Sequence, residues 1–389
     1  MLTTNIEFKN FKVRKSNKKI LYLLKKLFKE ENKILDSLKK NYKDTFDNKT
    51  VSKLRKYSEV RIIGMGGSIL GSRSIYSFLK DKIKKSFYFK DNFEKTNFTI
   101  KNKDKKKKLN LIISKSGNTL ETISNSNVLI KNQVKNIFIT ENKKSYLMDL
   151  AKKLKSEVIF HNNFIGGRYS VLSEVGMLPA TLMGLNVNKF RRLNLLIKDK
   201  RFLNSLIQNV SSTLHFIKMK KFNSVILNYD KSSSDLFLWY QQLIAESLGK
   251  KGKGILPIIS NMPEDNHSLM QLYLDSFKNN FYTFFFINDS FSKKIDNSKL
   301  LTSHFYLKNK NLNKINKSQY LATERVFKRK NIPFRTFLPK KKNEETLGEL
   351  FTFFILETIL LGRALNVNPY DQPAVELIKT ETKKFLINS

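Results

Sequence analysis

The sequence predicts an α/β protein with two parallel sheets in series, each flanked by helices. Short apolar segments alternate with helical segments along most of the chain, and this alternation is typical of parallel sheets covered on both faces. A basic stretch, 189–201, divides the alternation into two runs. The 389 residues are 40% hydrophobic, enough for a large core in two or three domains. The expected parts are a helical N-terminal segment (1–50), a first domain (51–190), a second domain (201–370) and a C-terminal helix (371–389).

The first run supplies four strands. Apolar residues at helical spacing, including Ile20, Leu24 and Leu27, predict a helical lead-in before it. The strands are expected at 60–64, 109–114, 136–140 and 157–161, and the helices at 71–80, 119–132 and 144–155. In the second run the strands are expected at 224–229, 254–260, 281–288 and 332–338, and the helices at 233–249, 266–278, 318–330, 345–365 and 371–386.

Composition excludes several classes of function. The chain has no Cys, so disulfides, thiolate metal sites and a Cys nucleophile are excluded. The net charge is +40, but Lys is over-used along the whole chain and no nucleic-acid reader motif accompanies it. The densest run, 105–108, is interpreted as a solvated loop between strands. We therefore expect no nucleic-acid partner, although a positive field can attract an anionic small molecule.

The remaining composition favours a cytoplasmic protein without a metal site. The longest apolar runs, 281–287 and 350–361, are too short to span a membrane, and no secretory signal is recognised. No two of the four histidines stand at ligand spacing, so no metal site is predicted.

Two turns rich in small residues end strands of the first run. Gly64-Met65-Gly66-Gly67-Ser68 would let the backbone approach a ligand, or would simply make a tight strand–helix turn. The segment 114–122 (SKSGNTLET) places four hydroxyls and one ammonium before a helix. That composition favours a phosphate site, and helix capping is the alternative. The candidate ligands are Ser114, Lys115, Ser116, Thr119 and Thr122.

Further candidates follow along the chain. Two glycines precede Arg168, whose guanidinium can stabilise an anion or form an ordinary ion pair. Gln242 and Glu246 share one face of a helix, where Glu246 can act as a general base or pair with Lys250. His267 is expected at the start of another helix.

Six segments in this order resemble the glucose-6-phosphate isomerase (phosphoglucose isomerase) family, from about residue 60 to 380. They are GMGGSILG, SKSGNTLET, GGRYSVLSEVGMLPA, QQLIAESLGK, the segment around His267, and NPYDQPAVELIK, which contains Gln372 and Lys379. The last two residues are seven apart and are expected on one side of a helix. The resemblance implies two sugar-isomerase (SIS-type) domains, a homodimer, no cofactor, and the substrates glucose 6-phosphate and fructose 6-phosphate.

The resemblance also implies roles for individual residues. Glu246 matches the base that moves a proton between C1 and C2 through a cis-enediolate, and Arg168 matches the residue that stabilises the enediolate. His267 and Lys379 match the ring-opening pair, with His267 contributed by the neighbouring subunit. The matching substrate contacts are Gly67, Ser68, Gln242, Gln372 and the hydroxyl-rich segment.

Two alternatives stay open at this point. One is a dual phosphoglucose/phosphomannose isomerase on the same fold. The other is a non-catalytic sugar-phosphate-binding regulator, which could dispense with Glu246, Arg168 and Lys379, all of which are present.

Overall fold

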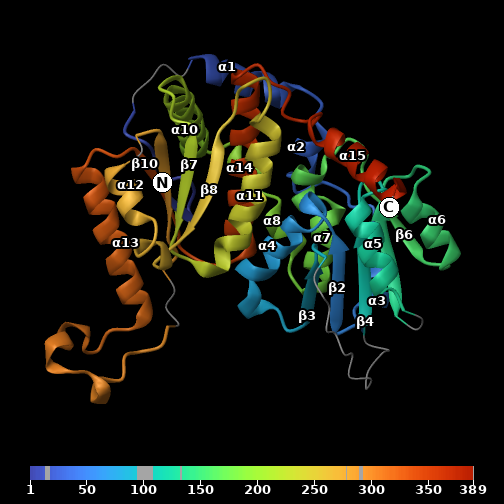
Figure 1. The fold of residues 1–389 in the computed structure, drawn as a ribbon, viewed down its shortest axis with the longest axis horizontal. Helices are drawn as coiled ribbons and strands as arrows, with labels where there is room; N and C mark the ends of the chain where they lie inside the picture. Colours follow the sequence, from blue (N-terminus) through green and yellow to red (C-terminus); the bar gives the residue numbers. More distant parts are fainter. Residues whose placement is uncertain (14–17, 94–107, 132–133, 277, 289–291, 389) are drawn as a thin grey trace.

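The computed structural model contains two five-stranded sheets (Figure 1). It describes residues 1–13, 18–93, 108–131, 134–276, 278–288 and 292–388. Most of the run at 105–108 therefore lies outside the described residues. No helix in the described part of the chain is long and apolar enough to cross a membrane.

The first sheet is parallel throughout, in the order β3-β2-β4-β5-β6. Its strands are β2 (Glu59–Gly64), β3 (Ser86–Lys90), β4 (Lys108–Ile113), β5 (Lys135–Thr140) and β6 (Glu157–Phe160). The helices of this part of the chain are α4 (Leu70–Phe78), α5 (Leu120–Leu129), α6 (Tyr146–Lys153) and α7 (Glu174–Leu182). Four of the five strands confirm the predicted segments, and β3 is additional.

The second sheet has the order β1-β10-β9-β7-β8. Its strands are β1 (Ile6–Lys9), β7 (Asn223–Asn228), β8 (Leu256–Asn261), β9 (Asn280–Phe285) and β10 (Phe334–Pro339). The prediction that residues 1–50 are helical is wrong for 6–9, because β1 joins β10 as an antiparallel edge strand. The other four strands are parallel, as expected.

The remaining helices pack on both units. The helices before the first sheet are α1 (Lys18–Lys29), α2 (Lys33–Ser37) and α3 (Asn48–Leu54). The basic stretch taken as a separator forms α8 (Val187–Phe190), α9 (Leu193–Leu196) and the start of α10 (Lys200–Lys218), so it is largely helical. The later helices are α11 (Ser234–Leu248), α12 (Met270–Asp275), α13 (Leu312–Arg329), α14 (Glu344–Ala364) and α15 (Val375–Asn388). For example, α3 packs against α7 of the first unit and α10 packs against α14 of the second.

Helices α11 and α14 lie between the two sheets (Figure 1). Nearly all of α14 is buried, and its Glu357 is compensated by an ion pair with the equally buried Arg335. Helix α11 packs against α14 and also against α4 of the first unit. A side chain on α11 can therefore reach the edge of the first sheet.

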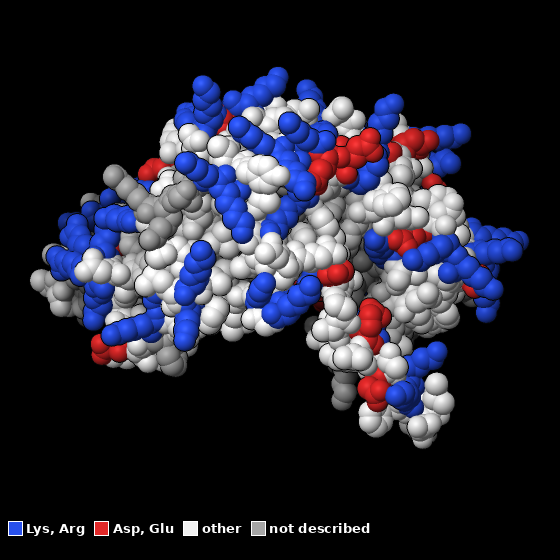
Figure 2. All heavy atoms as spheres, turned by 90° about the horizontal axis from the view of Figure 1, so that it is seen from above, with Lys and Arg blue, Asp and Glu red and all other residues white. Residues whose placement is uncertain are grey.

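The positive charge is dispersed over the face drawn in Figure 2. Figure 2 shows Lys and Arg side chains spread across the visible face instead of gathered in one patch. This distribution agrees with the interpretation of the net charge of +40 as a property of the whole composition.

Candidate functional site

The two turns rich in small residues open at the same edge of the first sheet. Strands β2 and β4 are parallel neighbours, and Gly64 is paired with Ile113 where both strands end. Neighbouring strands lie about 5 Å apart, so the turns that follow them are adjacent. This is the edge at which parallel sheets bind ligands.

Two glycines allow the turn after β2 to contact the rest of the site. Gly66 has φ +54°, and a Cβ there would lie 2.7 Å from Gln242 Nε2. A Cβ on Gly67 would lie 2.2 Å from the backbone carbon of Gly167. Ser68 ends the 3₁₀ helix η1 (Gly66–Ser68) that these glycines begin. The turn therefore does more than connect a strand to a helix, because its glycines let it pack closely against Gln242 and Gly167.

Arg168 is held on every side. It lies in the 3₁₀ helix η4 (Gly167–Leu172) and is 3% exposed. Its Nε donates to Ser247 Oγ (2.8 Å) and one terminal nitrogen donates to Gln372 Oε1 (2.7 Å). The other terminal nitrogen donates to the carbonyls of Pro369 (2.8 Å) and Asp371 (3.0 Å). A planar guanidinium with this many bonds has one orientation.

Glu246 faces this guanidinium from α11. Its Oε2 accepts a hydrogen bond from Arg168 (3.1 Å), and its Oε1 accepts one from Gln242 (2.9 Å). The carboxylate side chain is 31% exposed, against 2% for that of Arg168, so it is both fixed and accessible. Lys250 pairs instead with Asp371 (2.7 Å), so the alternative of a surface Glu246–Lys250 pair is wrong.

The hydroxyls of the second turn are not used as helix caps. Thr119 is the N-cap residue of α5, yet its side chain makes no capping bond and lies 2.8 Å from Ser114 Oγ. Thr122 is buried, and its Oγ1 has no hydrogen-bond partner among the described residues. Ser116 is exposed, and Gly117 (φ +67°) shapes the turn. Hydroxyls that do not cap the helix and lie beside its first amides suit an anion.

Lys115 points toward neighbouring turns. Its Nζ donates to the carbonyl of Asn163 (2.8 Å) and lies 3.3 Å from Glu141 Oε1. These contacts come from the segments after β6 and β5. The ammonium therefore links three strand ends in this structure.

The structure does not bring His267 and Lys379 to this centre. His267 is exposed and follows the 3₁₀ turn Glu264–Asn266, beyond the end of edge strand β8. Lys379 is exposed on α15 and donates to Glu376 (2.6 Å). No hydrogen bond joins either residue to Arg168 or Glu246 in the described part of the chain. Residues 266–269 precede α12, which begins only at Met270, so the expected helix start at His267 is three residues early.

Gln372 reaches the site by a different route from the one expected. Helix α15 begins at Val375, so Gln372 lies in the segment before it and does not share a helix face with Lys379. The segment is anchored by its own carbonyls to Arg168, and this places the Gln372 amide on the guanidinium.

Two residues of the centre, Ser247 and Tyr169, were not predicted from the sequence. Ser247 accepts from Arg168, and its Oγ lies 2.9 Å from the hydroxyl of Tyr169, which also donates to the carbonyl of Pro369. The available signal for Ser247 was a hydroxyl among the apolar positions of α11, because a buried polar group needs a partner. Backbone acceptors such as Pro369 leave no signal in a sequence.

The site has no metal-binding character in the described part of the chain, where no group of three or more His, Asp or Glu side chains could hold an ion. Its chemical resources are a carboxylate, a fixed guanidinium, amides and hydroxyls. These groups can move a proton, stabilise an oxyanion and bind a phosphate.

This combination on two SIS-type units defines the class of sugar-phosphate isomerases, and comparison with known proteins makes the assignment specific. The chain belongs to the phosphoglucose isomerase family, whose sequence model matches residues 11–256. It is 32% identical over 349 residues to the glucose-6-phosphate isomerase of Methanocaldococcus jannaschii, covering 83% of each chain.

Solved structures share the fold. A hypothetical protein from Thermus thermophilus superposes with a TM-score of 0.79 at 23% identity, over 95% of this chain and 94% of that one. A glucose-6-phosphate isomerase from Chlamydia trachomatis gives 0.70 at 18% identity, over 87% of this chain and 71% of that one.

Proposed function

We propose that this protein interconverts glucose 6-phosphate and fructose 6-phosphate, the aldose–ketose isomerisation of glycolysis and gluconeogenesis. The observation that carries the proposal is the fixed but accessible Glu246 carboxylate, held between Arg168 and Gln242, the latter against the turn after β2. Membership of the phosphoglucose isomerase family supports the same substrates. We expect the protein to act in the cytoplasm.

In the proposed reaction Glu246 acts as the general base. It removes the proton from C2 of the open-chain aldose, and the electrons of that C–H bond form the double bond of a cis-enediolate. The negative charge that develops on the sugar oxygen lies toward Arg168, whose orientation is already fixed by its other bonds. The hydroxyl proton on O2 then passes to O1, the C2 carbonyl forms, and Glu246 returns its proton to C1 to give the ketose. No electrons leave the substrate.

The phosphate is proposed to lie on the second turn. Ser114, Ser116, Thr119 and Thr122 supply hydroxyls, and the first amides of α5 supply donors in the direction favoured by the helix dipole. Gly67 and Ser68 are proposed to pass beside the sugar. Lys115 would have to release Asn163 to reach the phosphate, so we assign it to long-range attraction.

Ring opening needs two further groups, one to take the hydroxyl proton and one to protonate the ring oxygen. We assign these steps to His267 and Lys379. Because His267 is exposed beyond an edge strand of the second sheet, we propose that it serves the Glu246 centre of a second copy in a homodimer.

A coupled assay tests the proposal. Fructose 6-phosphate is converted in the presence of a metal chelator, and glucose 6-phosphate is detected. We expect full turnover. A parallel assay with mannose 6-phosphate shows whether the protein is instead a dual phosphoglucose/phosphomannose isomerase. Binding of the sugar phosphate without turnover would favour the non-catalytic regulator and would overturn the isomerase proposal.

A further inference from the structure

A second buried charge pair lies directly beside the turn that carries Arg168. His161 follows β6 and is 3% exposed, and Glu174 begins α7 and is fully buried. His161 Nδ1 lies 2.6 Å from Glu174 Oε1. Neither residue touches the Glu246 centre, and the proposed chemistry does not use them. A buried ionisable pair of this kind is costly to form and calls for an explanation.

The neighbours of His161 are acceptors at both ring nitrogens. Nε2 lies 2.9 Å from the carbonyl oxygen of Ile165, which can only accept, so Nε2 must donate. The other nitrogen faces Glu174, which already accepts from the Asn162 N–H (2.8 Å) and from the Tyr42 hydroxyl (3.1 Å). A carboxyl that accepts this many bonds at the start of a helix is ionised. These contacts suit an imidazolium–carboxylate pair.

The electrostatics of Glu174 agree with this state. Burial raises the pKa of its carboxyl, but the hydrogen bond and charge of His161 together with the Asn162 amide outweigh burial, so the pKa lies below its usual value. Burial and the nearby Glu174 charge raise the pKa of Tyr42, which keeps that hydroxyl a donor.

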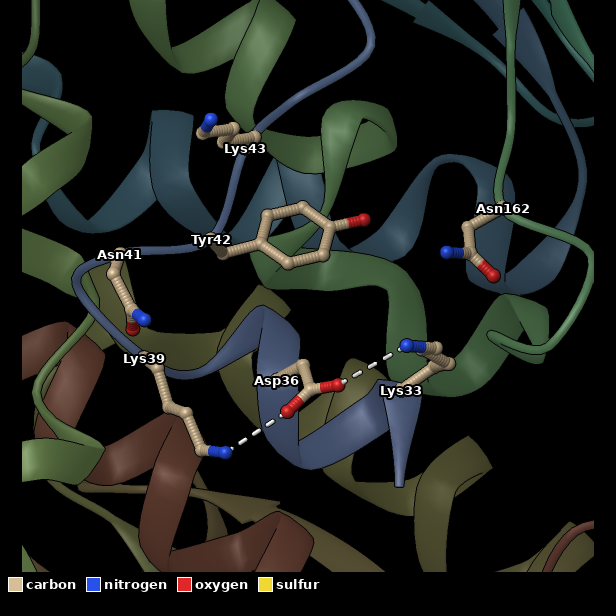
Figure 3. Close-up of a pocket in the computed structure, with 7 residues that line it drawn as sticks. All are labelled: Lys33, Asp36, Lys39, Asn41, Tyr42, Lys43 and Asn162. Atoms are coloured by element: carbon tan, nitrogen blue, oxygen red, sulfur yellow. Dashed lines mark hydrogen bonds and ion pairs between the residues drawn. The ribbon is translucent and has the colours of Figure 1, made fainter. Parts of the chain in front are cut away.

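Arg191, which also contacts Tyr42, has an acidic partner of its own. Arg191 stacks on the Tyr42 ring, with its guanidinium carbon 4.9 Å from the ring centre, and pairs with Asp44 (2.6 Å). Glu174 is thus left with His161 as its counter-ion. Figure 3 shows the Tyr42 hydroxyl directed toward the side of the pocket where Asn162 lies. This pocket of about 410 Å³ gives water a route to the network.

The pair anchors the backbone of the short turn that ends at Arg168. It holds the N–H of Asn162 at one end of that turn and the carbonyl of Ile165 near the other. The turn then continues through Gly167, whose backbone lies against Gly67, to Arg168. Loss of either of these hydrogen bonds would free one end of the turn, which could then move.

We propose that His161 and Glu174 are positioning residues, a charged pair that keeps the 162–167 turn in the shape that directs Arg168 at Glu246. The inference rests on the proposed function, because it concerns the rate of that reaction. Arg168 is also held by Ser247 and by the 369–372 segment, so loss of the pair weakens catalysis without abolishing it.

The test measures kcat and KM for the wild type and for Glu174→Gln, which keeps the size of the side chain but removes its charge. Without the carboxylate the imidazolium loses its counter-ion. We expect kcat to fall several-fold with KM nearly unchanged, because an amide holds the ring less firmly than a carboxylate does. Glu174→Ala should lower kcat about 10-fold at neutral pH with KM within about 2-fold, the size expected for a small displacement of a catalytic group.

A matched control separates positioning from stability. Tyr320→Phe removes a buried hydrogen bond to Glu324 (2.9 Å) in the second unit, far along the chain from the Arg168 turn. We expect it to lower Tm while leaving kcat unchanged. A folded Glu174→Gln protein with the wild-type kcat would overturn the inference, whereas an inactive wild type would overturn the proposed function instead.

A measurement independent of turnover covers the case in which the Glu174 variants do not fold. The ¹⁵N chemical shifts of the four histidine rings are recorded in the wild type near neutral pH, and His161 is assigned by its slow exchange and burial. We expect both of its nitrogens to be protonated. A neutral His161 ring would overturn the charged pair.

Discussion

The proposed reaction uses two pairs of residues. The members of one pair are in contact in the structure, and those of the other are exposed and apart. Glu246 and Arg168 face each other at 3.1 Å, and the Arg168 side chain is 2% exposed. His267 is exposed beyond the edge strand β8, and the Lys379 side chain is 64% exposed on α15. One chain therefore assembles the proton-transfer pair completely and leaves the ring-opening pair apart.

The contrast follows from how each pair is supported. Arg168 is hydrogen-bonded to α11 and to the 369–372 segment, so two segments far apart in the sequence fix its position. Helix α15 has no buried residue, and several of its apolar side chains are about 70% exposed, namely Leu377, Ile378, Phe385 and Ile387. Such a helix gains little stability from its own chain. The homodimer proposed above would explain both its apolar surface and the lack of a hydrogen bond between His267 and Glu246 among the described residues of one chain.

The largest effect is expected at the assembled pair. Glu246→Gln keeps the side-chain shape but removes the base, so kcat should fall about 10³-fold, within the range for loss of a general base. Arg168 still orients the site, and we expect KM to change little. The measurement is the coupled assay together with binding of a sugar phosphate by calorimetry.

Glu264→Gln is a matched control, because this carboxylate is exposed in the turn before His267 and makes only a weak ion pair with Lys231 (3.9 Å). It should leave kcat unchanged. Near-normal turnover of the Glu246→Gln protein would remove Glu246 from the role of base.

The difference between the two pairs also marks what a sequence can predict. Glu246 and Gln242 were predictable because helical spacing places them on one face, and Arg168 because two glycines precede it. The turns after β2 and β4 were predictable because parallel strands end at one edge. In each case the signal lies within a few residues.

The features that were missed depend on partners far along the chain. Strand β1 has four residues, too few for their alternation to stand out, and it gains its ladder from β10 at the other end of the chain. Gln372 lies outside the expected helix because the carbonyls of its segment bond Arg168. Lys115 was assigned by composition alone, and the acceptors after β5 and β6 decide its direction.

A smaller effect is expected at the separated pair, and it can show where His267 acts. His267→Ala should lower kcat about 100-fold for the cyclic substrate, the lower end of the range for a general acid or base. We expect less effect on an open-chain analogue, because ring opening is then bypassed. Equal losses on both substrates would contradict the assignment of His267 to ring opening.

Mixing two inactive variants tests the contribution across subunits. Glu246→Gln and His267→Ala proteins are unfolded and refolded together. In a mixed dimer one site then combines an intact Glu246 with an intact His267 from the other subunit, so activity should return to about a quarter of the wild-type value. No recovery in dimers proven to be mixed would place both residues in the site of one chain.

The smallest effect is expected in the turn after β4, which lies on the assembled side of the comparison but contacts a part of the substrate that does not react. Thr119→Ala removes a hydroxyl that is paired only with Ser114 and makes no helix cap. Loss of one hydrogen bond to a charged group costs about 1.5 kcal/mol, so KM should rise about 10-fold with kcat within about 2-fold. The inhibition constant of inorganic phosphate should rise in parallel, because the same contact is lost, and an unchanged KM would exclude Thr119 from the phosphate site.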